Sequence, residues 1–117
     1  MRDANPLSDL TEIMEAIARI ERYTAGLSES DFCASDKDVD ATAMNLIVIG
    51  EAVRRLQPAL LSREAAIPWP RIVSVRNRIA HGYSSVQRPV VWSIATRELP
   101  ELRAAVERLI AGFQPPA

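Results

Sequence analysis

Apolar residues recur at steps of three and four along most of this chain, and this spacing restricts its fold more than any other feature. The clearest case lies between about residues 8 and 25, where five apolar side chains follow a helical period: Leu10, Ile13, Met14, Ile17 and Ile20. This spacing places apolar side chains on one face of an α-helix. No segment shows the alternation of apolar and polar residues that is typical of a strand. The sequence therefore predicts an all-α protein.

Capping and turn residues divide the pattern into separate helices. We expect long helices over about residues 8–25, 36–57, 70–81 and 88–112, with short helices near 28–33 and 58–63. Ser8 is the expected N-cap of the first helix, and Gly26 is expected to end it. Gly82 fits the left-handed position just past the helix over 70–81. The prediction is an antiparallel bundle of four main helices plus short connecting helices, in a single domain over residues 1–117.

Two residues are unfavourable inside the predicted helices. Gly50 lies in the middle of one of them, where glycine costs about 1 kcal/mol relative to alanine. We expect it to mark a close approach by a neighbouring helix.

Pro100 lies inside the last predicted helix and must kink or interrupt it. Of the larger apolar side chains, Trp69 and Trp92 are expected to anchor the core, and Met14 and Met44 to fill it.

The charges are unevenly distributed. The net charge is −1, but residues 1–53 carry eleven acidic and four basic side chains, whereas residues 54–117 carry four acidic and ten basic ones. Either the second half creates a local positive field, or the acidic helices pair with the basic ones inside the bundle. Sequence-specific DNA binding is not expected, because no helix-turn-helix is recognisable and the net charge gives little attraction for phosphate.

Cysteine content and hydropathy indicate where the chain resides. Cys33 is the only cysteine, so an internal disulfide is impossible, and we expect it to act as a small buried apolar residue. The longest aliphatic run, residues 46–49, is far too short to cross a bilayer. The expected location is the cytoplasm, with no membrane partner.

The residues with the clearest chemical potential lie between positions 76 and 83. Arg76, Asn77 and Arg78 precede His81, which is the only histidine, and Tyr83 follows it. Histidine both accepts and donates protons near neutral pH, and arginine binds phosphate through two parallel hydrogen bonds. The combination indicates phosphodiester chemistry that needs no metal.

Helical geometry decides which of these side chains lie together. Asn77 and His81 are four residues apart, so they share a face roughly opposite the apolar stripe. Arg76 is five residues before His81 and therefore lies roughly 140° away around the helix. A relaxed last turn, or a second copy of the helix across a two-fold axis, would bring them together. The wide apolar arc of this helix favours a homodimer.

The segment from Arg76 to Tyr83 has the pattern R-N-x-x-x-H-x-Y. It resembles the signature of the HEPN superfamily of helical ribonucleases, in the HepT-like toxin branch. The resemblance covers nearly the whole chain and includes four further segments, at residues 19–24, 45–52, 67–69 and 91–92. It implies a HEPN-like fold and a symmetric dimer that cleaves RNA without a metal or another cofactor.

The resemblance also implies roles for individual residues. Arg76 would hold the scissile phosphate, His81 would be the general acid or base, and Asn77 would orient one of the reacting groups. Attack by the ribose 2′-hydroxyl would leave a 2′,3′-cyclic phosphate. The implied partner is an MNT-type nucleotidyltransferase, which acts as the antitoxin of a type VII pair by adding AMP to Tyr83.

Several interpretations remain open at this stage. Glu51 is expected to pair with an arginine of the helix over 70–81, either Arg76 or another, in a supporting role. Arg78 is either such a supporting residue or a solvated one. The loop over residues 84–87 departs from the family pattern, which puts the substrate preference in question. The alternative function is a non-catalytic helical module that binds nucleotides or a nucleotidyltransferase.

Overall fold

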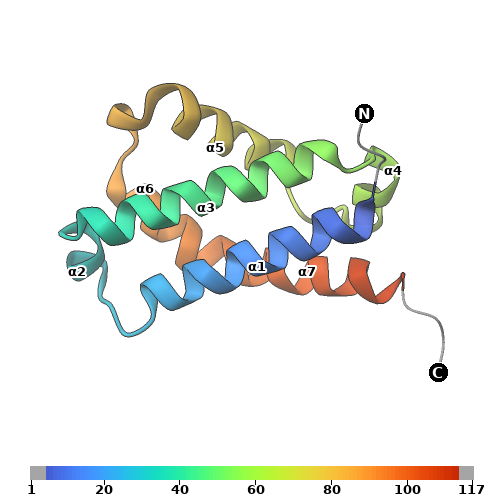
Figure 1. Cartoon of the computed structure of the whole chain (residues 1–117), viewed down its shortest axis with the longest axis horizontal. Helices are drawn as coiled ribbons and strands as arrows, with labels where there is room; N and C mark the ends of the chain where they lie inside the picture. The colour runs from blue at the N-terminus through green and yellow to red at the C-terminus, as the bar shows by residue number, and fades with distance from the viewer. Residues whose placement is uncertain (1–4, 114–117) are drawn as a thin grey trace.

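The structure, a computed structural model, describes residues 5–113, and the described residues are helical and contain no strand (Figure 1). Residues 1–4 and 114–117 of the predicted domain lie outside the described part. The α-helices are α1 (Pro6–Thr24), α2 (Glu29–Cys33), α3 (Asp36–Arg55), α4 (Pro58–Leu61), α5 (Trp69–Gly82), α6 (Arg88–Ser93) and α7 (Leu99–Ala111). Two 3₁₀ turns, η1 (Ser62–Glu64) and η2 (Tyr83–Ser85), and a π-helical turn, η3 (Ile94–Glu98), connect them. The all-α prediction is confirmed.

The long helices run antiparallel to their neighbours, as Figure 1 shows. Helix α3 packs between α1 and α5, and α1 also packs against α7. The fourth main helix is the continuous run α6–η3–α7, in which α6 contacts α2 and α7 contacts α1. One face of α5 therefore rests on α3, while its opposite face is turned away from the bundle.

The helix ends agree with the predictions at some positions and differ at others. Gly26 has a φ of +75° and ends α1 as expected. The N-cap of α1 is Asn5 rather than Ser8: the Asn5 Oδ1 accepts a hydrogen bond of 3.1 Å from the Ser8 N–H. The helix begins one turn earlier because proline at position 6 suits the first turn. Gly82 has a φ of −158°, outside the left-handed region, so α5 passes directly into the η2 turn.

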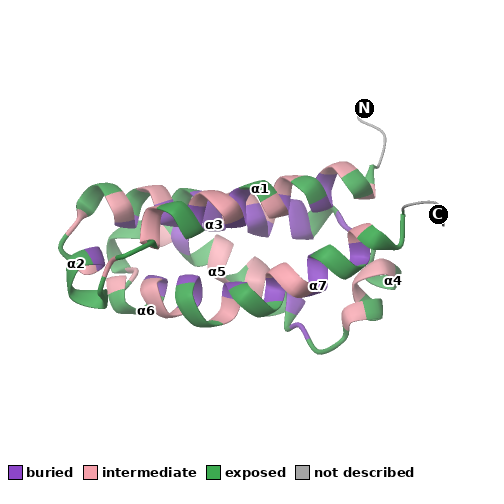
Figure 2. Cartoon of the chain, turned by 90° about the horizontal axis from the view of Figure 1, so that it is seen from below, coloured by how far each residue is buried: buried purple, intermediate pink, exposed green. Residues whose placement is uncertain are grey.

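The buried residues lie between the four main helices, as Figure 2 shows, and they are almost entirely aliphatic. Trp69 is buried, and Trp92 is half-buried with its ring centroid 5.2 Å from that of Phe32. Cys33 is also half-buried. The prediction for Met44 is wrong, because this side chain is 60% exposed on the outer surface of α3.

Gly50 marks a close approach of helices, as expected. A Cβ atom at this position would overlap the Cβ of Arg76 on α5. Because only glycine leaves this space, α5 lies close against the middle of α3. Position 50 therefore sets the distance between the helix that carries Arg76 and the rest of the bundle.

The π-helical turn η3 accommodates Pro100. The Leu99 N–H donates to the Ile94 carbonyl, five residues earlier, instead of four as in an α-helix. Proline has no N–H of its own and excludes a regular α-helical turn before it. The predicted interruption therefore takes the form of a widened turn directly before Pro100, and the chain stays helical.

The uneven charge distribution is resolved largely by pairing within the bundle. Arg55 Nε lies 3.0 Å from Asp9 Oδ1, and Arg103 pairs with Glu21. Both arginines come from the second half of the sequence and both carboxylates from the first. Among residues 5–113, no helix combines the length and the apolar character that a membrane span requires.

Candidate active site

Arg76 is held from two sides on α5. Its Nε lies 2.5 Å from Glu51 Oε1 on α3, and its Nη1 donates to Asn77 Oδ1 at 3.0 Å. Its side chain is 19% exposed, because its stem packs against Gly50. The predicted pairing of Glu51 with Arg76 is confirmed. The Asn77 contact uses one of the five N–H bonds of the guanidinium group, and the Glu51 contact is an ion pair in which Nε makes no hydrogen bond within the described residues, so the group is oriented and keeps further donors for an anion.

His81 lies in the last turn of α5 and is exposed. Asn77 is also exposed and lies one turn earlier on the same face, whereas Ile79 is buried on the opposite side. Asn77 therefore adjoins the His81 position along the helix and contacts Arg76 as well. Arg76 and His81 themselves lie roughly 140° apart around α5.

Arg78 is exposed on α5, and no ion pair of this side chain occurs within residues 5–113. It precedes His81 by three residues, a spacing that makes two side chains neighbours on a helix surface. This agrees with the interpretation of Arg78 as a solvated residue. A supporting role was considered for both Glu51 and Arg78, and of the two it is Glu51 that contacts Arg76.

Tyr83 is the first residue of the η2 turn, and its ring leans back towards the start of α3. Its hydroxyl donates a hydrogen bond to Asp40 Oδ1, and the side chain is 43% exposed. Partial burial, together with the Asp40 carboxylate, raises the pKa of Tyr83 to about 12. The phenol is therefore neutral at physiological pH.

Sequence reasoning missed Asp40. In the sequence, Asp40 is one of three aspartates over residues 36–40, and such a cluster is typical of the first turn of a helix, where it favours the positive end of the helix dipole. The available signal was the antiparallel order of the two helices, which brings the start of α3 close to the end of α5. Arg88 belongs to the same region: its Nη2 lies 2.5 Å from Asp36 Oδ1, and its Nη1 donates to the Cys33 carbonyl at 2.8 Å.

A shallow, mainly apolar groove runs between α3 and α5 beside the candidate site. It is lined by Asp40, Ala43, Met44, Ile47, Ile79, Ala80 and Tyr83. The exposed Met44 lies along this groove. The outer surface next to Tyr83 thus combines apolar contact area with residues of the candidate site.

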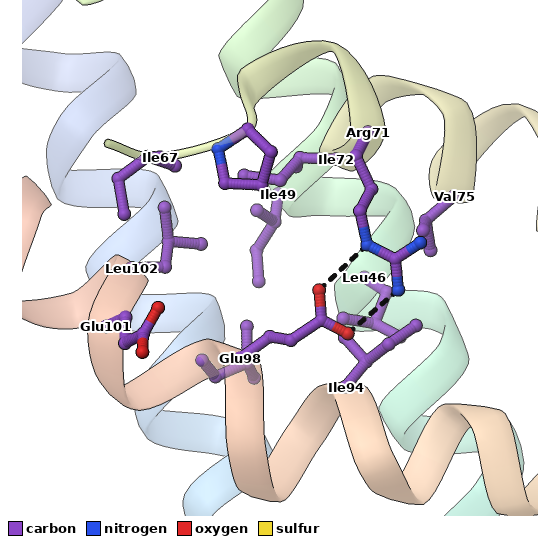
Figure 3. Close-up of a pocket in the computed structure, with 12 residues that line it drawn as sticks. Leu46, Ile49, Ile67, Arg71, Ile72, Val75, Ile94, Glu98, Glu101 and Leu102 are labelled. Atoms are coloured by element: carbon purple, nitrogen blue, oxygen red, sulfur yellow. Dashed lines mark hydrogen bonds and ion pairs between the residues drawn. The ribbon is translucent and has the colours of Figure 1, made fainter. Parts of the chain in front are cut away.

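A second pocket opens on the other flank of α5 (Figure 3). Its walls are aliphatic side chains of α3, α5, η3 and α7, and Arg71 and Glu98 form a double hydrogen bond of 2.9 Å each across its rim. None of the sequence-predicted site residues lines this pocket. It is therefore separate from the candidate active site.

The fold and these contacts define a class: an antiparallel helical bundle that presents an oriented arginine, an amide and a histidine at the end of one helix. The sequence profile of the family described as Ribonuclease HepT-like matches residues 13–109. The chain belongs to this family.

Individual relatives agree with this assignment. The chain is 30% identical over 100 residues to "Probable ribonuclease HepT" of Thermococcus cleftensis, covering 86% of this chain and 91% of that protein. It is 27% identical over 105 residues to "Putative RNase TTE0752" of Caldanaerobacter subterraneus subsp. tengcongensis, covering 90% and 94%. The match to "Gamma-glutamylcyclotransferase and putative RNase MJ0434" of Methanocaldococcus jannaschii is 28% over 101 residues, covering 86% of this chain and only 46% of the relative. No solved structure matches the chain.

Proposed function

We propose that this protein is a metal-independent endoribonuclease and the toxin of a type VII toxin–antitoxin pair. One observation carries the proposal: Arg76 is oriented by Glu51 and Asn77, five residues before the exposed His81 on the same helix. Membership of the Ribonuclease HepT-like family supports RNA as the substrate.

In this mechanism Arg76 binds the scissile phosphate through the N–H groups that Glu51 and Asn77 leave unused. His81 takes the proton from the ribose 2′-hydroxyl or gives one to the leaving 5′-oxygen. Attack of the 2′-oxygen on phosphorus then forms a 2′,3′-cyclic phosphate. Acid–base catalysis of this kind contributes ~10²–10⁴-fold, and charge stabilisation by the guanidinium adds to it.

The active site is shared between two copies of the chain. On one α5 helix, Arg76 and His81 point in directions roughly 140° apart. A two-fold axis at the α3–α5 groove brings the His81 of one copy towards the Arg76 of the other. In such an isologous interface the same surface of each copy takes part, so every contact occurs twice. The exposed Met44 and the apolar groove supply the contact area that such a dimer buries.

The antitoxin of the pair is an MNT-type nucleotidyltransferase that adds AMP to Tyr83. The Tyr83 side chain is 43% exposed, so the enzyme can approach it, and it lies two residues from His81. An added phosphate carries negative charge, so it opposes the binding of a second phosphate in the same site. Modification therefore inhibits cleavage.

Cleavage of tRNA and mRNA by the purified protein in EDTA tests the catalytic proposal. Wild type is expected to cut, and His81→Ala is expected to lose ~10²–10⁴-fold in rate. Arg76→Ala is expected to lose activity as well, and Arg97→Ala is its control, because Arg97 is an exposed arginine on η3, a different element from the one that carries Arg76. Equal activity of wild type and His81→Ala contradicts the proposal, and ATP binding without cleavage favours a non-catalytic module.

Mixing two inactive variants tests the shared site. In a dimer formed by Arg76→Ala and His81→Ala chains, one of the two composite sites keeps both groups. After random subunit exchange, about a quarter of the wild-type rate is expected to return. No recovery, although heterodimers form, shows that each chain carries its own complete site.

A further inference from the structure

The connection between α5 and α6, residues 82–87, packs against the core through the half-buried Val86 and makes few polar contacts with the other helices. Ser85 Oγ donates to the Gly82 carbonyl at 2.7 Å, which is a contact inside the connection. Within the described residues, the bond from Tyr83 to Asp40 is the only side-chain hydrogen bond that links this connection to another helix. Asp40 therefore ties the connection to the start of α3.

His81 directly precedes this connection, with only Gly82 between it and Tyr83. The last turn of a helix frays unless other contacts hold it, and Gly82 has no side chain to contribute one. From this geometry we infer that Asp40 is a positioning residue: through Tyr83 it holds the last turn of α5 and so the direction of His81. The inference rests on the proposed ribonuclease function, in which His81 transfers the proton.

The same contact gives the proposed modification a second effect. When the phenolic oxygen of Tyr83 bonds to the α-phosphorus of a nucleoside triphosphate, pyrophosphate leaves and the phenol proton is lost to solvent. Tyr83 then has no O–H to donate to the Asp40 carboxylate. The new phosphate also faces the Asp40 carboxylate, which repels it, whereas the nearby Asp36 is paired with Arg88, whose guanidinium attracts a phosphate away from Asp40. Modification therefore releases the end of α5 in addition to blocking the site.

The single histidine makes this inference directly measurable. The ring protons of His81 are the only histidine signals in an NMR spectrum of the chain. We expect Asp40→Ala and Tyr83→Phe to shift and broaden these signals in the same way, and the double variant to change them no further. Such non-additivity is expected when two residues act through one contact.

Asp38→Ala is the matched control, since it removes a carboxylate from the same turn of α3 and leaves the Tyr83 bond in place. It is expected to leave the His81 signals unchanged. If Asp38→Ala shifts them as much as Asp40→Ala does, general electrostatics explains the effect and the inference is wrong. Unchanged signals in Asp40→Ala also overturn it.

Kinetics supplies a second readout. A misplaced His81 slows the chemical step, so Asp40→Ala and Tyr83→Phe are each expected to lower kcat about 10-fold with KM nearly unchanged, and the double variant to lower it no more. Additive losses contradict the inference. If wild type does not cleave RNA, the proposed function fails, whereas the NMR comparison still decides whether Asp40 holds the end of α5.

Discussion

The two ends of α5 differ sharply in how they are held. At the N-terminal end, Trp69 is only 7% exposed, and its ring N–H donates to the carbonyls of Leu61 and Glu64 at 3.0 and 3.1 Å. At the C-terminal end, Ile79 is buried, but beyond it His81 is exposed and one side-chain hydrogen bond holds Tyr83 to α3. One helix therefore joins an anchored end to a lightly held one.

The residues that stabilise α5 and the residues proposed for catalysis therefore lie at different ends of the helix. Burial and satisfied hydrogen bonds at the Trp69 end hold the helix in place. The polar groups at the His81 end contribute little to folding, so they can stay exposed to an RNA phosphate. Between them, the contact of Gly50 with Arg76 fixes how close the site lies to α3. We expect substitutions at the Trp69 end to lower the free energy of unfolding and substitutions at the His81 end to lower the rate of RNA cleavage.

Trp69→Ala is expected to give the largest loss of stability. Truncation of a buried tryptophan costs ~3–5 kcal/mol, and here it also removes the ring N–H that donates to the Leu61 and Glu64 carbonyls. Urea unfolding followed by circular dichroism measures the change. His81→Ala is the counterpart, with an expected change within about 0.5 kcal/mol despite its loss of activity. Similar losses for both variants would show that the two ends do not differ in this way.

Gly50→Ala tests the middle of the helix. The added methyl group overlaps the stem of Arg76, so α5 must move away from α3 at a cost of ~1–3 kcal/mol. RNA cleavage is expected to fall as well, because Arg76 shifts. Gly82→Ala is the matched control: its Cβ would lie 3.2 Å from Ser85 Oγ, a side-chain atom that can turn aside. A larger loss of stability for Gly82→Ala would argue against the Gly50 contact as the constraint.

Glu98→Gln is expected to have the smallest effect, at the anchored end. The hydrogen bond from Arg71 lowers the pKa of Glu98 below its ordinary value of 4.5. The pair therefore stabilises the fold above pH 4.5, and this contribution is lost as the pH falls through the lowered pKa. Because both side chains are half-exposed, the difference between wild type and variant at pH 7 is at most about 1 kcal/mol. Unfolding curves at pH 7 and below pH 4 check it, and a difference that grows in acid would contradict the assignment.

Apolar periodicity located the long helices to within a few residues, since burial of one face dominates helix stability in a folded chain. The spacing of Asn77 and His81 also predicted their shared exposed face correctly. Gly50 correctly predicted the close contact of α3 with α5. A glycine inside a helix lowers its stability relative to alanine, so its presence there indicates a place where no side chain fits.

Other features depend on neighbours that are distant in sequence. Gly82 was expected in a left-handed conformation, but the Tyr83 side chain is held on Asp40 and the chain continues in a right-handed 3₁₀ turn. Asp40 lies 43 residues before its partner, so no local pattern connects them. Met44 fits the apolar period of α3, yet it lies on the surface next to the α3–α5 groove, where nothing in a single chain covers it.

The widened turn before Pro100 has a consequence for how the last helix tolerates changes in length. Each residue of an α-helix rotates the following side chains by about 100°. If the turn over Ile94–Glu98 became a regular α-helical turn with all its residues kept, α6 would keep its contact with α2, but the side chains of α7 would swing away from α1. Leu102, Val106 and Leu109 would then face water, whereas deletion of one residue together with that change would leave them in place. The extra residue therefore acts as a phase adjustment that lets one continuous rod present different faces to two different partners.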